Sequence, residues 1–222
     1  MDTKLKITAD GSHTFFVPEL DEHYHSVNGA IQESMHVFID AGLKQCEKTE
    51  VNVLEIGFGT GLNAFLSLLE AEKMNWKIDF TSLELYPISA SEAKKLNYAE
   101  LIDPFQKENF RKLHSAEWDK WEQITIYFSL QKLCLDFSDP QNFQPESKFD
   151  IIFFDAFAPD KQPEMWAQPI FDSLYSFCNA DAILTTYCAK GSVRRMLTTA
   201  GFKVERLLGP KGKREMLRGR RI

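Results

Sequence analysis

One segment constrains the fold of this chain more than any other: a short apolar strand that runs through a glycine-rich turn into a helix. Val51–Ile56 is the predicted strand, and Gly61–Asn75 places its apolar residues at helical spacing. Glycine recurs at alternate positions of the turn, so the backbone can bend sharply and a ligand can approach without meeting a Cβ atom. The arrangement is typical of open α/β sheets that bind a ligand at their strand ends. The turn lies in L-E-I-G-F-G-T-G-L-N, with Gly57, Phe58, Gly59 and Gly61 as candidate ligand contacts.

The glycine spacing argues against a nicotinamide or flavin dinucleotide. The dinucleotide fingerprint, G-x-G-x-x-G, would place its third glycine at position 62, where this chain has Leu62. A purely structural glycine turn without a ligand is the alternative interpretation. The strand-turn-helix context favours a ligand other than NAD or FAD.

The rest of the chain alternates between strand-like and helical patterns, which predicts an α/β fold. Helices of this length between strands require right-handed crossovers, so we expect a doubly wound, mostly parallel sheet covered on both faces. The last two strands, joined by Gly209–Lys213, predict an antiparallel hairpin. The expected strands are Val51–Ile56, Ile78–Leu85, Ile124–Leu130, Lys132–Phe137 (these two as a possible hairpin), Phe149–Phe154, Ala182–Tyr187, Phe202–Leu208 and Arg214–Arg220; the expected helices are Gly61–Asn75, Ser89–Leu101, Pro163–Asn179 and Ser192–Ala200.

Length favours a single domain, because 222 residues of which 44% are hydrophobic can bury one sizeable core. We expect residues 51–222 to form this domain and residues 1–50 to be an extension packed on it. Gly29–Leu43 has helical spacing. Asp10–Ser26 is expected to be a loop, which could fold over a site or simply lie on the surface.

The distribution of charge is uneven along the chain. A formal net charge of −6 argues at first against a nucleic-acid partner. Residues 190–222, however, hold 11 of the 26 basic residues and only two acids, Glu205 and Glu215. Such asymmetry indicates either a polyanion bound on one face or a solvated basic tail.

Three further features concern the compartment and metal binding. The four cysteines form no C-x-x-C pair, no apolar stretch approaches the length of a membrane span, and the first residues lack the apolar run of a signal peptide. We therefore expect a cytoplasmic protein with no membrane association. Glu22, His23 and His25 are close in sequence but lack spaced partners, so no metal site is expected.

Three carboxylates follow predicted strands at the edge where open α/β sheets bind ligands. Glu84, 27 residues after Gly57, could accept both hydroxyls of a ribose, although a surface acid is the alternative. Asp136 could accept from an adenine amino group or form a turn. Asp155 ends the most apolar strand and precedes the stiff stretch to Pro159, so it faces the site unless it serves as a cap or turn former.

These motifs resemble a known family, the methyltransferase half of the bacterial tRNA-modifying enzyme MnmC and, still more, its standalone form MnmD. The resemblance runs from about Tyr24 to Leu217. It rests on four segments, of which the glycine turn is shared by many methyltransferases and the last two are much more specific: Ser26–Phe38, Leu54–Asn63, Phe154–Trp166 and Gly209–Leu217.

The resemblance implies a seven-stranded, Rossmann-like sheet of the class I methyltransferase type. It also implies methyl transfer from S-adenosylmethionine to the exocyclic amine of 5-aminomethyl-(2-thio)uridine at the tRNA wobble position. The flavin-dependent oxidase half of the bifunctional enzyme has no counterpart in this chain. The implied roles are catalysis for Asp155, contact with the methionine part of the cofactor for Gly57, Gly59 and Gly61, with its ribose for Glu84 and with its adenine for Asp136.

The tRNA would be held by the basic C-terminal segment, and its extruded base by aromatic rings. The alternative for each ring, and for an aromatic residue taken alone the commoner one, is a place in the core. The candidates for phosphate contact are Arg194, Arg195, Lys211, Lys213 and Arg214, and those for stacking are Phe157 and Trp166.

Two other functions remain open from the sequence. An aminopropyltransferase of the spermidine synthase type uses a related fold and a carboxylate near the same strand end, but gives no reason for a basic tail. A non-catalytic RNA-binding module would have no need of the glycine turn, Glu84 and Asp155 together.

Overall fold

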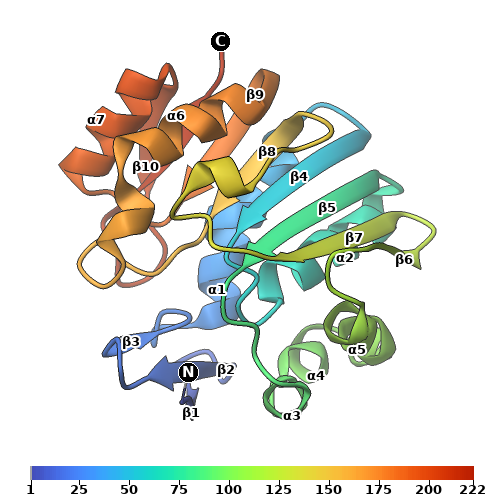
Figure 1. Cartoon of the computed structure of the whole chain (residues 1–222). Helices are drawn as coiled ribbons and strands as arrows, with labels where there is room; N and C mark the ends of the chain where they lie inside the picture. The colour runs from blue at the N-terminus through green and yellow to red at the C-terminus, as the bar shows by residue number, and fades with distance from the viewer. Residues whose placement is uncertain (1) are drawn as a thin grey trace.

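An eight-stranded sheet forms the centre of the protein, whose computed structural model describes residues 2–222 (Figure 1). Its order is β10-β11-β9-β8-β4-β5-β7-β6, with parallel pairing between β9, β8, β4, β5 and β7 and antiparallel pairing at both edges. The sheet has the eight strands that the sequence pattern predicts, one more than the seven that the family resemblance implies. The strands are β4 (Glu50–Ile56), β5 (Lys77–Glu84), β6 (Trp121–Thr125), β7 (Phe128–Cys134), β8 (Phe149–Phe154), β9 (Cys178–Thr186), β10 (Lys203–Leu208) and β11 (Glu215–Arg220).

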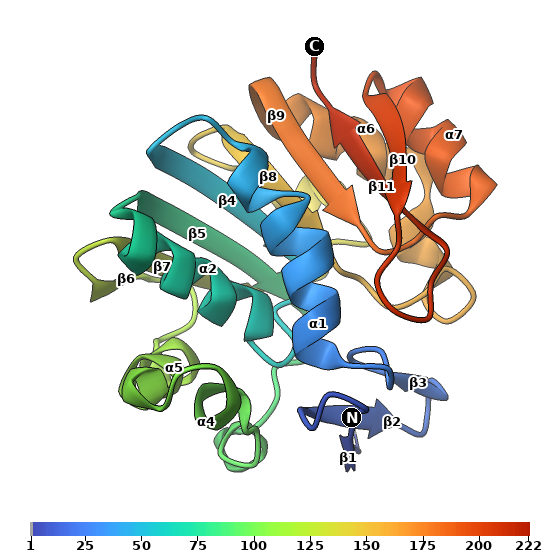
Figure 2. The same cartoon turned by 180° about the vertical axis from the view of Figure 1, so that it is seen from behind.

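Helices cover both faces of this sheet, which confirms the doubly wound α/β fold. Figure 2 shows α1 (Ala30–Ser34) and α2 (Leu62–Met74) over one face, and Figure 1 shows α6 (Gln168–Phe177) and α7 (Gly191–Ala200) on the other side. The helix α1 continues as a π-helical stretch, Met35–Asp40. Three short helices, α3 (Ala90–Ala93), α4 (Tyr98–Ile102) and α5 (Lys107–Ser115), follow β5. Within residues 2–222, no helix combines the length and the apolar character that a bilayer span requires.

The central strand β8 shows why the core has two halves. All six of its residues are buried, and successive side chains of a strand point to opposite faces. Phe153 therefore packs against Phe38 with 5.2 Å between ring centroids, while Phe154 packs against Phe171 on the other face at the same separation. Burial on both faces explains the apolar run Ile151–Phe154 of this strand. Its one charged residue, Asp150, is also buried and pairs with Lys48 across 2.6 Å.

Three expected elements are placed differently by the structure. The hairpin β6–β7 turns at Ile126–Tyr127, so β6 ends five residues and β7 begins four residues earlier than expected. The apolar Ile126, expected in a strand, is a turn residue that is 74% exposed. The expected helix Ser89–Leu101 divides into α3 and α4, since the Asn97 amide binds the N-terminal segment through His13 N and Gly11 O. The expected helix Pro163–Asn179 begins as a separate 3-10 turn, and its last two residues belong to β9.

The N-terminal segment is a small antiparallel sheet, not the expected loop. It consists of β1 (Lys4–Ile7), β2 (His13–Val17) and β3 (Glu22–His23). Tyr98 OH donates to His13 O across 2.7 Å, and so connects this sheet to α4. Residues 22–27, which follow β2, line a cavity at the carboxyl ends of the parallel strands.

Candidate active site

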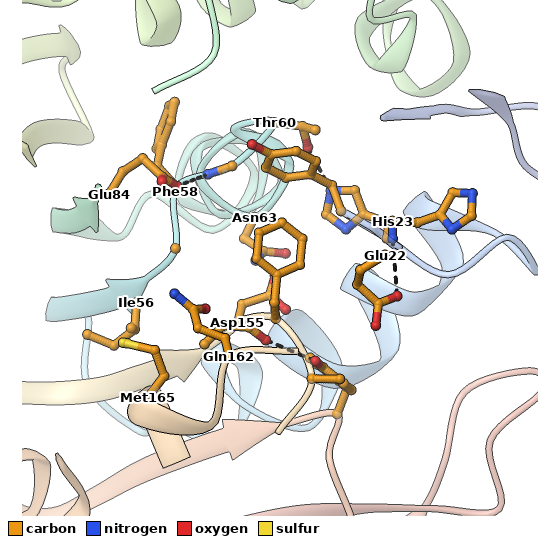
Figure 3. Close-up of a pocket in the computed structure, with 18 of the residues that line it drawn as sticks. Glu22, His23, Ile56, Phe58, Thr60, Asn63, Glu84, Asp155, Gln162 and Met165 are labelled. Atoms are coloured by element: carbon orange, nitrogen blue, oxygen red, sulfur yellow. Dashed lines mark hydrogen bonds between the residues drawn. The ribbon is translucent and has the colours of Figure 1, made fainter. Parts of the chain in front are cut away.

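A cavity of about 390 Å³ opens at the carboxyl ends of the parallel strands. Its size suits a small-molecule ligand. It is formed by the glycine turn after β4, the ends of β5 and β8, the N-terminal segment and one residue of the β10–β11 loop. Figure 3 shows Glu84 and Asp155 at two separate places on its wall, with Asn63 between them.

The glycine turn fits closely between its neighbours. Gly57 and Gly59 have φ of +97° and +50°, a left-handed conformation that favours glycine. A Cβ atom at Gly57 would lie 2.8 Å from the Asp155 carbonyl oxygen, and one at Gly59 would lie 3.0 Å from the Tyr24 ring. The turn leads directly into α2. The N-terminal end of this helix, with its free backbone N–H groups, therefore lies at the cavity.

Glu84 is held against this turn. Its Oε2 accepts from Gly59 N across 2.9 Å, and its Oε1 accepts from Tyr86 N across 2.8 Å. Burial raises the pKa of the Glu84 carboxyl, and these backbone donors oppose the increase. Each oxygen keeps a further lone pair, so the carboxylate can accept two ligand hydroxyls in a fixed orientation.

Phe58 and Asp136 occupy the same end of the cavity. Phe58 is buried, with its ring 5.6 Å from His114 and 6.1 Å from Trp118 between centroids. Asp136 follows β7, is exposed, lines the cavity and accepts from Ser138 N across 2.8 Å. Asp136 therefore forms a turn, one of the two interpretations of its sequence position, and also borders the site.

Asp155 lies at the other end of the cavity. Its Oδ2 accepts from Asn63 Nδ2 across 2.9 Å, and its backbone N–H donates to Ile56 O. Burial raises the pKa of the Asp155 carboxyl to about 7, with a smaller increase from the negative charge of Glu33; Asn63 and Lys213 oppose the increase. A carboxyl group with this pKa can exchange a proton near neutral pH.

Lys213 is part of the cavity wall and is not the free phosphate ligand that we expected. Its Nζ lies 2.6 Å from Glu33 Oε1 and 3.8 Å from the centroid of the Tyr187 ring. The loop that carries it folds inward because Gly212 packs against the Asn28 side chain. Because of its ion pair with the buried Glu33, Lys213 is not part of the exposed basic surface.

Trp166 cannot stack on a substrate base, so that prediction is wrong. Its side chain is 5% exposed, packs against Phe154 and donates its indole N–H to Phe157 O across 2.7 Å. Phe157 itself lines the cavity, with its ring 5.2 Å from that of Tyr24. Trp166 therefore supports the segment that carries Phe157.

The other predicted phosphate ligands are on the surface. Arg194 and Arg195 are exposed in the first turn of α7, and Lys211 and Arg214 are exposed in the β10–β11 loop. The loop reaches the cavity through Lys213. Lys211 and Arg214 therefore lie in a loop that borders the site, while α7 begins at Gly191, four residues after Tyr187 of the cavity wall.

Sequence reasoning missed three contributors to the site. Asn63 follows the glycine turn directly, a position that could have indicated it. Tyr187 follows β9 and donates to Ala156 O across 2.9 Å. His25, considered only as a metal ligand, is buried and its Nε2 lies 2.6 Å from Thr60 Oγ1 in the glycine turn. No sequence pattern points to the contact of His25, because it joins residues 35 positions apart.

The residues present fit S-adenosylmethionine. The glycine turn leaves room for backbone contact with the methionine part, and Glu84 can bind a ribose. Asp155 lies at the far end of the same cavity, beside Asn63 of α2. A cofactor whose ribose is bound by Glu84 would thus extend along the glycine turn toward Asp155, a carboxylate that can bind an amine.

Comparisons with known proteins agree with this fit. A family model described as S-adenosyl-L-methionine-dependent methyltransferase matches residues 103–222. The bifunctional protein MnmC of Paraburkholderia xenovorans, named for tRNA 5-methylaminomethyl-2-thiouridine biosynthesis, is 30% identical over 97% of this chain and 34% of its own length. The chain thus spans about a third of the length of the curated relative.

Two solved structures resemble the fold. MnmC2 from Aquifex aeolicus has a TM-score of 0.79 and 26% identity, covering 98% of this chain and 70% of that one. Spermidine synthase from Thermotoga maritima has a TM-score of 0.54 at 10% identity, covering 100% of this chain and 72% of that one, and shows the shared fold alone. The chain is a member of the S-adenosyl-L-methionine-dependent methyltransferase family and is similar in sequence to MnmC.

Proposed function

We propose that the protein transfers a methyl group to the exocyclic amine of 5-aminomethyl-(2-thio)uridine at the tRNA wobble position, giving 5-methylaminomethyl-2-thiouridine. The observation that carries the proposal is the placement of Asp155, with a pKa of about 7, in one cavity with the glycine turn and Glu84. The substrate class comes from the similarity to MnmC. We further propose that this methylation takes place in the cytoplasm.

The lining of the cavity supports the proposed cofactor contacts. Gly57 and Gly59 border the methionine part, Phe58 adds to the cavity wall, Glu84 binds the ribose, and Asp136 is close to the adenine. Gly61, the third glycine expected to contact the cofactor, does not line the cavity and instead caps the N-terminus of α2. S-adenosylmethionine supplies a methyl carbon on a sulfonium, so a nitrogen–carbon bond forms as the sulfur–carbon bond breaks. The residues of the chain must therefore remove a proton from this nitrogen and hold it in place.

Preparation of the amine is the task of Asp155. An aminomethyl group is mostly protonated in water, and an ammonium ion has no lone pair with which to attack. Asp155 can accept a hydrogen bond from this group, hold it and receive its proton. Asn63 fixes the carboxylate through Oδ2, which leaves Oδ1 for the acceptor amine. Correct placement alone contributes roughly 7 to 11 kcal/mol toward such a two-reactant step.

The tRNA is proposed to lie across the exposed cations of the C-terminal segment. Arg194, Arg195, Lys211 and Arg214 would contact phosphates, and Phe157 would stack on the extruded base. Lys213 is assigned to the interior of the site because of its ion pair with Glu33.

The test is mass spectrometry of nucleosides from tRNA incubated with the purified protein and isotopically labelled cofactor. The substrate tRNA is isolated from cells that accumulate the 5-aminomethyl nucleoside. We expect one labelled methyl group on this nucleoside. Transfer of an aminopropyl group to a polyamine, with unmodified tRNA, would contradict the proposal and favour the aminopropyltransferase alternative.

A further inference from the structure

A buried ion pair in the cavity wall has no role in the account so far. Glu33 of α1 and Lys213 of the β10–β11 loop are 180 residues apart in sequence, yet Lys213 Nζ lies 2.6 Å from Glu33 Oε1. The Glu33 side chain is only 8% exposed and that of Lys213 is 33% exposed. Removal of two charges from water is costly, so a pair at this depth is weak evidence for stability alone.

Several contacts fix the position of both charges. Ser26 N donates to Glu33 Oε2 across 2.9 Å, and the Lys213 ammonium also lies over the face of Tyr187. Tyr187 is itself held by its bond to Ala156 O, next to Asp155. Gly212 packs against Asn28 so closely that an added Cβ would collide with the side chain. The two charges are therefore held in the wall of the same cavity that Asp155 lines.

Both charges act on Asp155, in opposite directions. Glu33 raises the pKa of the Asp155 carboxyl and Lys213 lowers it, with the larger effect from Glu33. Glu22, Glu84 and Asp136 also line the cavity, but Glu33 and Lys213 are the two charged groups that shift the pKa of the Asp155 carboxyl. Burial lowers the pKa of His25 to about 4, and raises the pKa of Glu55 and Tyr187 well above their usual values and that of Cys188 above its own.

We infer that the Glu33–Lys213 ion pair sets the basicity of Asp155 toward the acceptor amine: Glu33 makes the carboxylate a stronger proton acceptor, and Lys213 keeps it ionised near neutral pH. The inference rests on the proposed function. The proton passes from the ammonium nitrogen to Asp155 Oδ1, leaving a neutral amine and a carboxylic acid. After methyl transfer the acid releases that proton to water. Glu33 and Lys213 are thus positioning residues that act through Asp155.

The direct test is a pH titration of the Asp155 carboxyl carbon by NMR in the protein without added ligands. We expect a midpoint near 7 in the wild type. Glu33→Gln removes a negative charge and lowers the midpoint, while Lys213→Met removes a positive charge and raises it. Glu33→Gln gives the larger shift, and each exceeds ~0.5 pH unit. Lys213→Arg keeps the charge and restores the wild-type midpoint.

Two control variants distinguish the effect of a removed charge from a disturbance of the folded structure. Lys211→Met removes an exposed cation from the same loop and leaves the midpoint unchanged. The double variant Glu33→Gln with Lys213→Met leaves no unpaired buried charge, and its midpoint lies between those of the two single variants. Equal midpoints in the wild type and both single variants would overturn the inference.

The inference and the proposed function fail in different ways. In an active enzyme, the acidic limb of the kcat/KM profile moves in the same direction as the NMR midpoint of each variant. Suppose that Glu33→Gln and Lys213→Met shift the midpoint in opposite directions but the protein methylates no tRNA. This result would support the effect of the ion pair on Asp155 and would refute the proposed substrate. Methylation of tRNA with equal midpoints would support the function and refute the effect of the ion pair.

Discussion

Asn63 Nδ2 lies 2.9 Å from Asp155 Oδ2, and this bond joins the first turn of α2 to the end of β8. Asn63 directly follows the glycine turn, and Asp155 is the carboxylate proposed to bind the acceptor amine. This side-chain bond therefore connects the turn proposed to bind the cofactor with the carboxylate proposed to bind the acceptor amine. A displacement of the turn would be transmitted to the carboxylate.

The first prediction concerns Glu84. Glu84→Gln removes the charge and places an amide donor beside either Gly59 N or Tyr86 N, so one of two backbone bonds is lost. We expect the dissociation constant for S-adenosylmethionine to rise roughly 10- to 100-fold, as for a lost bond to a charged group. Isothermal calorimetry measures it. Asp136→Asn serves as the comparison, with the smaller effect of an exposed acid; equal effects would remove the ribose role of Glu84.

The second prediction concerns the bond between His25 and the glycine turn. His25→Phe keeps the ring volume but removes the contact of Nε2 with Thr60 Oγ1. A lost buried hydrogen bond costs about 1 to 3 kcal/mol. We expect a lower unfolding temperature together with weaker cofactor binding. His36→Phe, which removes a bond to Leu208 O away from the turn, should leave cofactor binding unchanged. Unaltered binding in His25→Phe would show that the turn needs no support from the N-terminal segment.

The third prediction concerns the cost of Asp155 to stability. Its pKa is about 7 in the folded protein against 3.8 for the ordinary group, so the folded state disfavours the charged form. The resulting loss in the free energy of unfolding is absent below about pH 4 and grows as pH rises. It is complete above about pH 7, where it reaches at most ~4 kcal/mol. Asp155→Asn should therefore stabilise the protein at high pH.

Urea unfolding at about pH 8 and about pH 5 checks this prediction. We expect the excess stability of Asp155→Asn to be clearly larger at the higher pH. A variant that is destabilised equally at both would show that the charge of Asp155 is well accommodated in the folded protein.

The fourth prediction concerns the exposed cations. Charge reversal of Lys211 and Arg214 to Glu should raise the KM for tRNA without a change in cofactor affinity, because both side chains are exposed. Each lost phosphate contact should reduce the slope of log KM against log salt concentration by roughly 0.7 to 0.9. An unchanged slope would exclude this loop from the tRNA surface. Lys203→Glu, on β10, is the comparison for general charge effects.

The sequence predicted those parts of the fold that depend on local pattern. The bounds of β8 were predicted correctly because its mostly apolar sequence, interrupted only by Asp150, lies between Lys148 and Asp155. The hairpin β6–β7 was displaced because the exposed Ile126 resembles a strand residue in sequence. The small N-terminal sheet was missed because its strands are short and one of them, β1, is fully exposed, so the chain there has no clear apolar alternation.

For the site, the sequence identified residues whose position follows from a strand end. Glu84 and Asp155 border the cavity for this reason. The roles of Lys213 and Trp166 were not predictable, because each depends on a tertiary contact: an ion pair with Glu33 in one case, and burial against Phe154 in the other. Residue type alone indicated a phosphate ligand and a stacking ring.

The most direct test of the account is a single-turnover methylation assay with Asp155→Asn. The asparagine can still accept from Asn63 but cannot take a proton. We predict that the dissociation constant for S-adenosylmethionine stays within about threefold of the wild type, while the rate of methyl transfer to tRNA falls roughly 10²- to 10⁴-fold. A variant that binds the cofactor normally and methylates tRNA at the wild-type rate would contradict the role of Asp155, and with it the proposed reaction site.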